Sequence, residues 1–298
     1  MRICISTKGR AFNPEAQAYQ EFFQALGHLC SIRPGRIDYR SFDVVILFNG
    51  FNPFWRRYPQ TVVEEYQSLS TGQFRRLKDV TKRLLNKRGQ IVIAPSDYVL
   101  RGMFFRNNER TVIRPMGYFP ELKHNVISKR YGLVYAGSER LGLRDCIAKF
   151  DRLGLKILMI GNFEHFQYTN VTTLPMVPPN KVPALLDQAT CGLNFVPARS
   201  PFIYQDSTKV IEYASRGLGI ISNSYPWIDD FFKDRGGRYL NIDHATNLNI
   251  IRDFRYAPPR VSDLAWPTLL DKCGLAEALE KFSHSNSEKN RGLLSLWI

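Results

Sequence analysis

The sequence has few cysteines, and it lacks long apolar runs. Its five cysteines are scattered over 298 residues, and no two of them form a CxxC pair. An odd, scattered set is typical of reduced thiols in a cytosolic protein, and it argues against a disulfide framework. No apolar run approaches the roughly 20 residues that a membrane-spanning helix needs, and the apolar start before Lys8 is too short for a signal peptide. We therefore expect a cytoplasmic protein.

Histidine is also sparse. The five histidines show none of the short separations at which metal ligands recur in a sequence. The adjacent carboxylates Asp229 and Asp230 follow Tyr-Pro-Trp at the predicted start of a helix. Carboxylates at such a place usually cap the helix or face water. The sequence therefore predicts no metal site and no other cofactor.

Positive charge, in contrast, is abundant and unevenly distributed. The net charge is +14, and residues 1–130 hold 22 Lys/Arg and 10 Asp/Glu, which leaves the remaining residues nearly balanced. This asymmetry predicts that the N-terminal half faces an anionic partner. The candidates are an anionic membrane surface, at the inner face of the membrane, and a nucleic acid.

Apolar runs alternate with helical patterns along the chain, and the alternation starts again near residue 130. The first half contains "RICIS", "DVVILFNG", "IVIAPS" and "TVIRPMG", and the second half contains "YGLVYAGS", "KILMIGN", "CGLNFVP" and "LGIIS". Strands that are apolar throughout and alternate with helices predict parallel sheets covered on both faces. We expect an α/β protein with two Rossmann-like domains that face each other across a cleft. The first domain would span residues 1–125 and the second residues 126–298, including a C-terminal helical tail.

The stretch "FIYQDSTKVIEYASRGLGIISNS" at 202–224 is the most informative. It predicts a loop at the carboxyl end of a parallel strand, where open α/β sheets bind ligands, followed by a helix that begins near Ser207. The free N–H groups of a helix start, with Thr208 and Lys209, would suit a diphosphate. Glu212 would share their face of the helix and could bind a ribose diol. The alternative is an ordinary helix start with a solvated Lys209–Glu212 pair.

The same residues carry a family resemblance. "STKVIEYASRGLGIIS" resembles the signature helix of GT-B glycosyltransferases, in particular the large retaining family that uses nucleotide-diphosphate sugars. Ser207, Lys209, Glu212, Tyr213 and Gly217 match that pattern. The segment from "YGLVYAGS" to "KILMIGN" is similar to the first βαβ unit of the family's C-terminal domain. The resemblance implies a GT-B fold and transfer of a sugar from a nucleotide-diphosphate donor, with a UDP-sugar first among the donors, to an acceptor hydroxyl without a bound metal.

The resemblance also implies roles for particular residues. Lys209 and Arg144 would be catalytic. The expected donor-binding residues are Gly137, Ser138, Arg140, Asp206, Ser207, Thr208, Lys209 and Glu212. Two positions depart from the family pattern, because Tyr204 stands in place of a second glutamate and Ser138 in place of an arginine. These departures leave the donor sugar and the stereochemistry of transfer open.

The acceptor side is predicted in the basic N-terminal half. A helical wheel of "FRRLKDVTKRLLNKRGQ" separates an apolar face, expected to dock on the sheet, from a row of exposed cations. Aromatic residues in "FNPFWRRYP" would suit an anionic membrane surface or stacked bases. The acceptor-side candidates are Lys8, Gly9, Arg10, Arg75, Arg76, Lys82 and Arg83. We expect a glycan or a lipid-linked acceptor. Two alternatives stay open: a modified base in DNA as the acceptor, and a non-catalytic basic binding module on a transferase scaffold.

Overall fold

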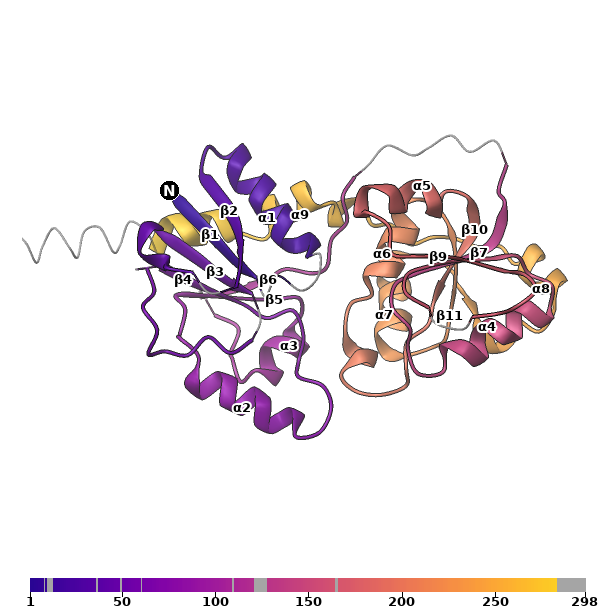
Figure 1. The fold of residues 1–298 in the computed structure, drawn as a ribbon, viewed down its shortest axis with the longest axis horizontal. Coiled ribbons are helices and arrows are strands. Elements are labelled where there is room, and N and C mark those ends of the chain that lie inside the picture. Colours follow the sequence, from indigo (N-terminus) through magenta and orange to yellow (C-terminus); the bar gives the residue numbers. More distant parts are fainter. Residues whose placement is uncertain are drawn as a thin grey trace, which may run out of the picture. The chain divides into compact units, whose positions relative to one another are not determined.

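The chain forms two compact α/β units. The computed structural model describes residues 1–282 apart from 8, 10–12, 36, 49, 60, 109, 121–127 and 164–165. The first unit comprises Met1–Gly117 and the C-terminal segment that begins at Trp266, and the second comprises Tyr118–Ala265 (Figure 1). Two units built on parallel sheets are what the alternating pattern predicts, so the predicted fold class is confirmed.

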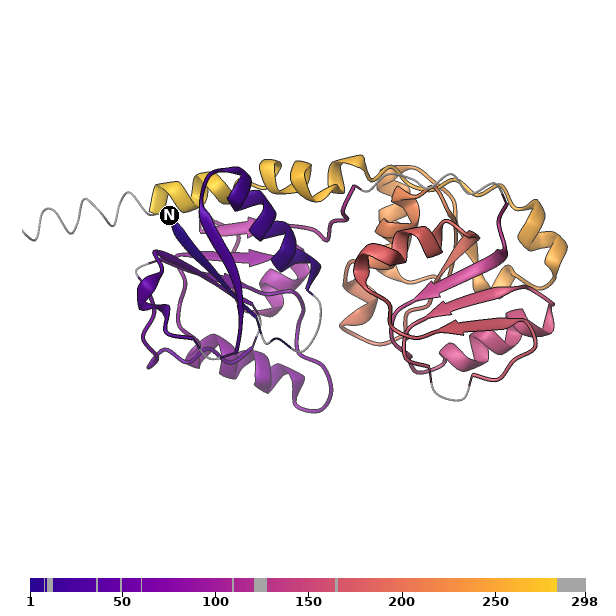
Figure 2. The same cartoon turned by 45° about the horizontal axis from the view of Figure 1, so that its top comes forward.

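The first unit contains a six-stranded parallel sheet in the order β2-β1-β3-β4-β5-β6. Its strands are β1 (Arg2–Thr7), β2 (Leu29–Pro34), β3 (Val44–Phe48), β4 (Thr61–Glu65), β5 (Ile91–Ala94) and β6 (Thr111–Ile113). Its helices are α1 (Pro14–Ala25), α2 (Arg75–Leu85), α3 (Asp97–Gly102) and α9 (Trp266–Lys272), with a 3-10 turn at Tyr39–Ser41. In both views α1 and α9 lie on one side of this sheet and α2 and α3 on the other (Figures 1 and 2). The central strands are apolar because both of their faces are buried.

The second unit contains another six-stranded parallel sheet, in the order β12-β11-β10-β7-β8-β9. Its strands are β7 (Tyr131–Ala136), β8 (Ile157–Ile160), β9 (Val171–Leu174), β10 (Ala189–Asn194), β11 (Gly219–Ser222) and β12 (Leu240–Asn241). Its helices are α4 (Leu143–Arg152), α5 (Val182–Leu186), α6 (Thr208–Ser215), α7 (Pro226–Arg235) and α8 (Leu248–Asp253). Short 3-10 turns lie at Pro179–Lys181, Phe202–Tyr204, Ile242–His244 and Ser262–Leu264. This strand order is that of the Rossmann fold, with the crossover between β7 and β10.

The C-terminal segment belongs to the first unit, whereas the sequence analysis places it in the second domain. The apolar side chains Trp266, Leu269 and Leu270 of α9 are buried, and α9 packs against α1. The apolar spacing of this segment predicts a helix but does not say which sheet the helix will cover. The predicted boundary after residue 125 lies outside the described residues, and the units divide between Gly117 and Tyr118.

A fully buried ion pair fixes α9 and α1 to the sheet of the first unit. Arg114, just after β6, pairs with Glu65 at the end of β4, and the side chains of both are inaccessible to solvent. The Tyr19 hydroxyl of α1 donates to Glu65 Oε2 at 2.9 Å. The Arg114 guanidinium also lies 5.3 Å from the centre of the Trp266 ring. Burial raises the pKa of the Glu65 carboxyl, and the positive charge of Arg114 opposes that shift.

Helix α2 is turned the opposite way from the prediction. Phe74 and Leu77 are 74% and 62% exposed, although the helical wheel assigns both to the docking face. Asp79 is buried instead, and its carboxylate accepts from the Ser70 N–H at 3.1 Å. The wheel identified the two faces correctly, but a buried carboxylate with a backbone partner decides which of them faces the protein.

In the part of the chain that the structure describes, no helix has the length and apolar character needed to traverse a bilayer.

Candidate functional site

The predicted donor residues gather where two neighbouring strands of the second unit end. Strands β7 and β10 pair in parallel at the centre of the sheet, although β8 and β9 lie between them in the sequence. Their carboxyl ends, Ala136 and Asn194, therefore lie at one edge, and the chain continues from them toward α4 and α6. In open α/β sheets this point of reversed strand order is where ligands bind. The fold thus brings the predicted segments 137–144 and 206–212 to the expected place.

Gly137 lets the loop after β7 pass close to Lys209. Its φ of 142° is a backbone conformation that residues with side chains rarely adopt. A Cβ atom on Gly137 would lie 2.9 Å from both Cε and Nζ of Lys209. The turn is held by the Gly137 N–H, which donates to Ile160 O at 2.9 Å, and by the Tyr135 hydroxyl, which donates to Ser138 O at 2.7 Å. The chain at this position therefore requires glycine.

Ser207 begins helix α6 and anchors it to the end of β10. Its hydroxyl accepts from the Val210 N–H as the helix cap and donates to Asn194 Oδ1 at 2.8 Å. Asn194 is completely buried, and its Nδ2 donates to Ser222 Oγ and to the Tyr225 hydroxyl, each at 2.9 Å. The Ser207 hydroxyl is thus occupied within the protein. The sequence patterns above did not predict a role for Asn194 or Tyr225. A single polar residue at the end of the apolar run "CGLNF" could have indicated Asn194.

Tyr213 holds the other end of α6 against β7. Its hydroxyl accepts from the Ala136 N–H at 3.3 Å. Its ring lies so close to β10 that a Cβ atom on Gly192 would approach it to 2.2 Å. The match of Tyr213 to the signature pattern therefore has a structural reason, because this side chain sets the position of α6 against the two strands of the site.

Lys209 is the most perturbed cation of the site. Its ammonium lies 5.1 Å from the centre of the Tyr135 ring, and no hydrogen bond or ion pair to it is found among the described residues. Burial, and then the nearby charge of Arg140, lower the pKa of Lys209 to about 7, while the Glu212 carboxylate opposes the shift. Arg140 is held in place by donating to Phe195 O at 3.2 Å. A bound anion would stabilise the charged form of a lysine whose pKa is lowered in this way.

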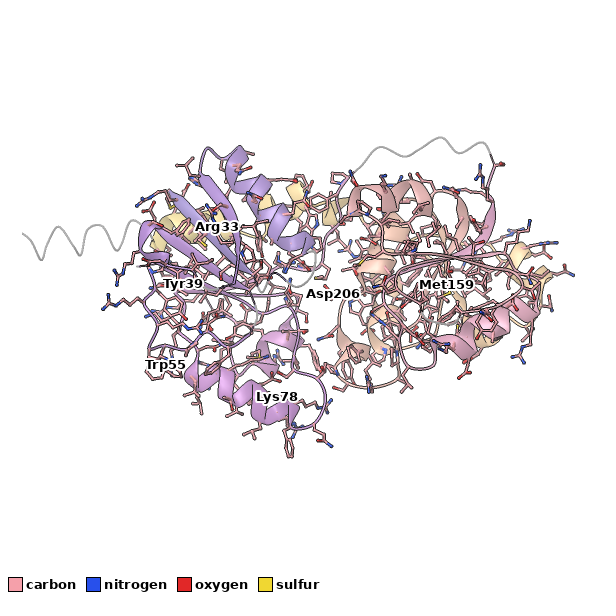
Figure 3. All side chains as sticks on the ribbon, in the orientation of Figure 1. Arg33, Tyr39, Trp55, Lys78, Met159 and Asp206 are labelled. Carbon is pink, nitrogen blue, oxygen red and sulfur yellow. The ribbon has the colours of Figure 1, made fainter. Side chains whose placement is uncertain are left out.

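The start of α6 adds neutral donors beside Lys209. The first backbone N–H groups of a helix have no partner within the helix, and at α6 these belong to Thr208 and Lys209. Glu212 lies three residues after Lys209 and four after Thr208, so it shares their side of α6. Asp206, labelled in Figure 3, lies two residues before the first residue of α6. The arrangement can bind a diphosphate and, one turn further along, a group with two hydroxyls.

Arg144 and Ser138, both in the chain segment that follows β7, are the remaining predicted donor-side residues. Arg144 binds Glu139 through two hydrogen bonds of 2.6 and 3.1 Å, and its guanidinium lies 4.5 Å from the centre of the Phe166 ring. The catalytic role of Arg144 stays a prediction. Ser138 is exposed beside Gly137, and its role as a donor ligand stays a prediction as well.

The acceptor-side residues are only partly described. Lys8 and Arg10 lie outside the described residues, while Gly9 has a φ of 67° and packs against Pro34. On α2, Lys82 donates to Ser70 Oγ at 2.8 Å, and the Arg83 guanidinium lies 4.4 Å from the centre of the Phe105 ring. Arg75 is half-buried and Arg76 exposed. The predicted continuous row of exposed cations is therefore interrupted, because Lys82 and Arg83 make contacts within the protein.

Within the described ranges, no three or more His, Cys, Asp or Glu side chains are grouped so that they could hold a metal ion.

Comparisons with known proteins identify the fold. No family model matches the sequence, and no curated protein matches it. Among solved structures, sucrose-phosphate synthase from Thermosynechococcus elongatus is 12% identical, with a TM-score of 0.60 over 99% of both chains. The glycosyltransferase AviGT4, involved in avilamycin A biosynthesis, is 14% identical, with a TM-score of 0.58 over 99% of this chain and 98% of that one.

An α-glucosyltransferase in complex with UDP and a 13-mer DNA containing an HMU base is 11% identical, with a TM-score of 0.59 over 95% of this chain and 99% of that one. The chain has the GT-B fold. The likeness runs through nearly the whole chain, so the GT-B architecture covers both units and not the second alone. At these identities the GT-B likeness concerns architecture, and the chemistry must be argued from the residues of the site.

Proposed function

We propose that this chain is a glycosyltransferase that moves a sugar from a nucleoside-diphosphate donor to an acceptor hydroxyl. One observation carries the proposal: Lys209, in the first turn of α6, lies against the glycine loop after β7, where β7 and β10 reverse the strand order of the sheet, and Arg140 of that loop donates to Phe195 O just after β10. A diphosphate would neutralise both cations and accept hydrogen bonds from the first N–H groups of α6.

In the proposed reaction, the acceptor oxygen forms a bond to the anomeric carbon of the sugar as the bond to the diphosphate breaks, and the hydroxyl proton is released to the leaving diphosphate or to water. The diphosphate leaves with the bonding electrons, so negative charge grows on its oxygens. Lys209, Arg140 and the α6 start would stabilise that charge, and losing one such donor typically costs about 10²–10³ in rate. Fixed cations of this kind would make transfer independent of metal.

The donor is proposed to be a UDP-sugar. Glu212 would accept hydrogen bonds from the ribose hydroxyls, since it lies one turn beyond Thr208 and Lys209 on α6. The DNA-bound α-glucosyltransferase of the same fold was solved with UDP, which supports uridine as the base. Tyr204 occupies the place of the glutamate that the resemblance would lead one to expect beside the sugar, so the sugar itself is left to experiment.

We propose a glycan or a lipid-linked intermediate as the acceptor. A modified base in DNA is the second candidate, favoured by the basic residues 1–130 and by the fold shared with an α-glucosyltransferase solved on DNA. A duplex acceptor would require its base to leave the stack. The sequence contains none of the usual nucleic-acid modules, which favours the first candidate.

A panel of nucleotide sugars, followed by mass spectrometry, tests the proposal. The purified chain is incubated with each donor in the presence of EDTA, first alone and then with glycan, lipid or DNA acceptors. We expect release of the nucleoside diphosphate from UDP-sugars, and a Lys209→Met variant should be at least about a hundredfold slower. If no nucleotide sugar is consumed under any of these conditions, the chain is not a glycosyltransferase of this kind.

A further inference from the structure

Helix α2 of the first unit presents apolar side chains to solvent. Phe74, Leu77 and Leu84 are 74%, 62% and 65% exposed. On a helix of 3.6 residues per turn Leu77 and Leu84, seven residues apart, point in nearly the same direction and lie about 10 Å apart along α2. Phe74 directly precedes the first residue of α2, with a left-handed backbone conformation (φ 55°). Surface helices usually turn such a stripe toward the core. Here it faces outward, so the stripe is available for contact with something outside the unit.

The opposite face of α2 attaches to the protein through polar contacts. The Asp79 carboxylate accepts from the Ser70 N–H at 3.1 Å, and Lys82 Nζ donates to Ser70 Oγ at 2.8 Å. The Asn86 side chain, just after the helix, donates to Gly50 O at 3.0 Å and accepts from the Asn52 N–H at 2.8 Å. These specific contacts fix the rotation of α2, so the outward direction of its apolar stripe is built into the fold.

A cluster of exposed aromatic rings extends the stripe at the C-terminal end of α2. The Phe54 N–H donates to Leu85 O at 2.9 Å, which ties this segment to the helix. The rings of Phe54 and Trp55 lie 5.2 Å apart, and Trp55 is 60% exposed. Figure 3 labels Trp55 and Lys78 near opposite ends of α2. The α2 patch, as we name it, consists of Phe51, Phe54, Trp55, Phe74, Leu77 and Leu84.

The charge around the α2 patch is of one sign. Residues 51–58 and 74–88 contain nine Lys/Arg and a single acidic residue, Asp79, which is buried. Two copies of the chain meeting through this patch would bring two sets of cations together, which disfavours self-association. The aromatic rings of the patch could stack on bases, but the exposed Leu77 and Leu84 could contact neither bases by stacking nor phosphates by charge, which disfavours a nucleic acid. Apolar side chains flanked by cations suit an anionic lipid surface.

We propose that the α2 patch inserts into the interface of an anionic lipid bilayer. Leu77, Leu84 and Phe74 would enter the boundary between head groups and acyl chains, with Trp55 at head-group level. Arg76, Lys78 and Arg88, all exposed, would contact the lipid phosphates. The inference concerns the first unit alone and does not depend on whether the second unit binds a nucleotide. A bilayer-bound chain would meet lipid-linked acceptors at the surface where they occur.

Vesicle flotation tests the proposal. The full chain is mixed with vesicles of phosphatidylcholine alone or of equal parts phosphatidylcholine and phosphatidylglycerol, over a salt series. We expect flotation with the anionic vesicles only, weakening as salt rises.

The Leu77→Ser/Leu84→Ser variant should bind about a hundredfold more weakly. Arg76→Glu/Lys78→Glu should bind at least about tenfold more weakly. Both substituted pairs are exposed, so the variants should retain the far-ultraviolet circular dichroism of the wild type.

The matched control uses exposed apolar residues of the second unit. Leu141→Ser/Met176→Ser removes side chains that are 78% and 76% exposed, and it should float as the wild type does. Equal flotation of the Leu77→Ser/Leu84→Ser variant and the wild type would contradict insertion and leave only a charge effect.

Salt-sensitive DNA binding without flotation would overturn the proposal in favour of a nucleic acid. Self-association that is lost in the Leu77→Ser/Leu84→Ser variant, again without flotation, would overturn it in favour of a second copy. Nucleotide titration of the same variants shows separately whether the donor site of the second unit binds, so a failure of membrane binding is distinguished from a failure of the proposed function.

Discussion

Binding of a nucleoside diphosphate should transfer a proton to Lys209. In the free protein, burial and the charge of Arg140 lower the pKa of Lys209 to about 7, from 10.5 for an unperturbed lysine. At about pH 8.5 the free amine is therefore mostly neutral. A diphosphate beside it favours the charged form and raises its pKa. Because the complex then holds a proton that the free protein lacks, binding takes up about one proton at this pH.

The same linkage sets the direction and size of the pH effect. If the pKa in the complex returns to the unperturbed 10.5, affinity for UDP should fall about twentyfold between about pH 7.5 and pH 9. Over this range a terminal phosphate already carries its full charge, because its second pKa is about 6. The fall therefore reports on the protein and not on the nucleotide.

Calorimetric titration with UDP measures both quantities. Titrations in two buffers of different ionisation enthalpy give the number of protons taken up, and a pH series gives the change in affinity. Lys209→Met should bind more weakly and take up none, whereas Lys233→Met, at an exposed lysine of α7, should behave as the wild type. Proton uptake near zero in the wild type, with an affinity that stays flat up to about pH 9, would refute the placement of the diphosphate beside Lys209.

Three further predictions concern the framework of the two units. Gly137→Ala should lower the free energy of unfolding by about 1–3 kcal/mol and weaken UDP binding, because the new Cβ would meet Lys209. Gly236 also has a positive φ but lies in open space, so Gly236→Ala should lower the free energy of unfolding less and leave UDP binding intact. Ser207→Ala should lower the free energy of unfolding by about 1 kcal/mol, because the helix cap is lost. Thr208→Ala should leave the free energy of unfolding nearly unchanged and weaken UDP binding. Urea denaturation and UDP titration of both variants measure these effects. Arg114→Met should lower the free energy of unfolding in urea by about 3–5 kcal/mol, because Glu65 stays buried without its partner. Arg2→Ala, which removes an exposed pair with Asp43, should lower it by less than about 1 kcal/mol. Equal effects of any variant and its control would contradict the corresponding explanation.

The arrangement of the second unit was largely predictable from the sequence. Apolar strands that alternate with helices leave few topologies, and a helix that starts at Ser207 after "CGLNFVP" must lie at the carboxyl edge of a parallel sheet. The spacing of Thr208, Lys209 and Glu212 then places them on one side of that helix. Local pattern and topology together bring these residues to one edge of the sheet, so their placement in the fold could be predicted without tertiary contacts.

Other features depend on contacts that the sequence pattern does not contain. The rotation of α2 is set by buried Asp79 and its bond to Ser70, so a hydrophobic pattern alone assigned the wrong face to the core. The placement of α9 follows from Trp266 packing on Arg114, two residues far apart in the sequence. The anchoring of Ser207 by Asn194 likewise joins a helix start to the end of a strand. Each is a pairwise contact between distant segments, which periodicity cannot reveal.

Titration of UDP into the wild type and into Glu212→Ala tests whether the donor binds at the start of α6. We expect saturable binding by the wild type without added metal. We also expect Glu212→Ala to weaken binding by about 1.5–3 kcal/mol, the range for a lost hydrogen bond to a charged group. Asp253→Ala, at an exposed carboxylate at the end of α8, should bind as the wild type does. An affinity for UDP and other nucleoside diphosphates that is undetectable in the wild type, or unchanged in Glu212→Ala, would contradict the assignment of the donor site to the start of α6.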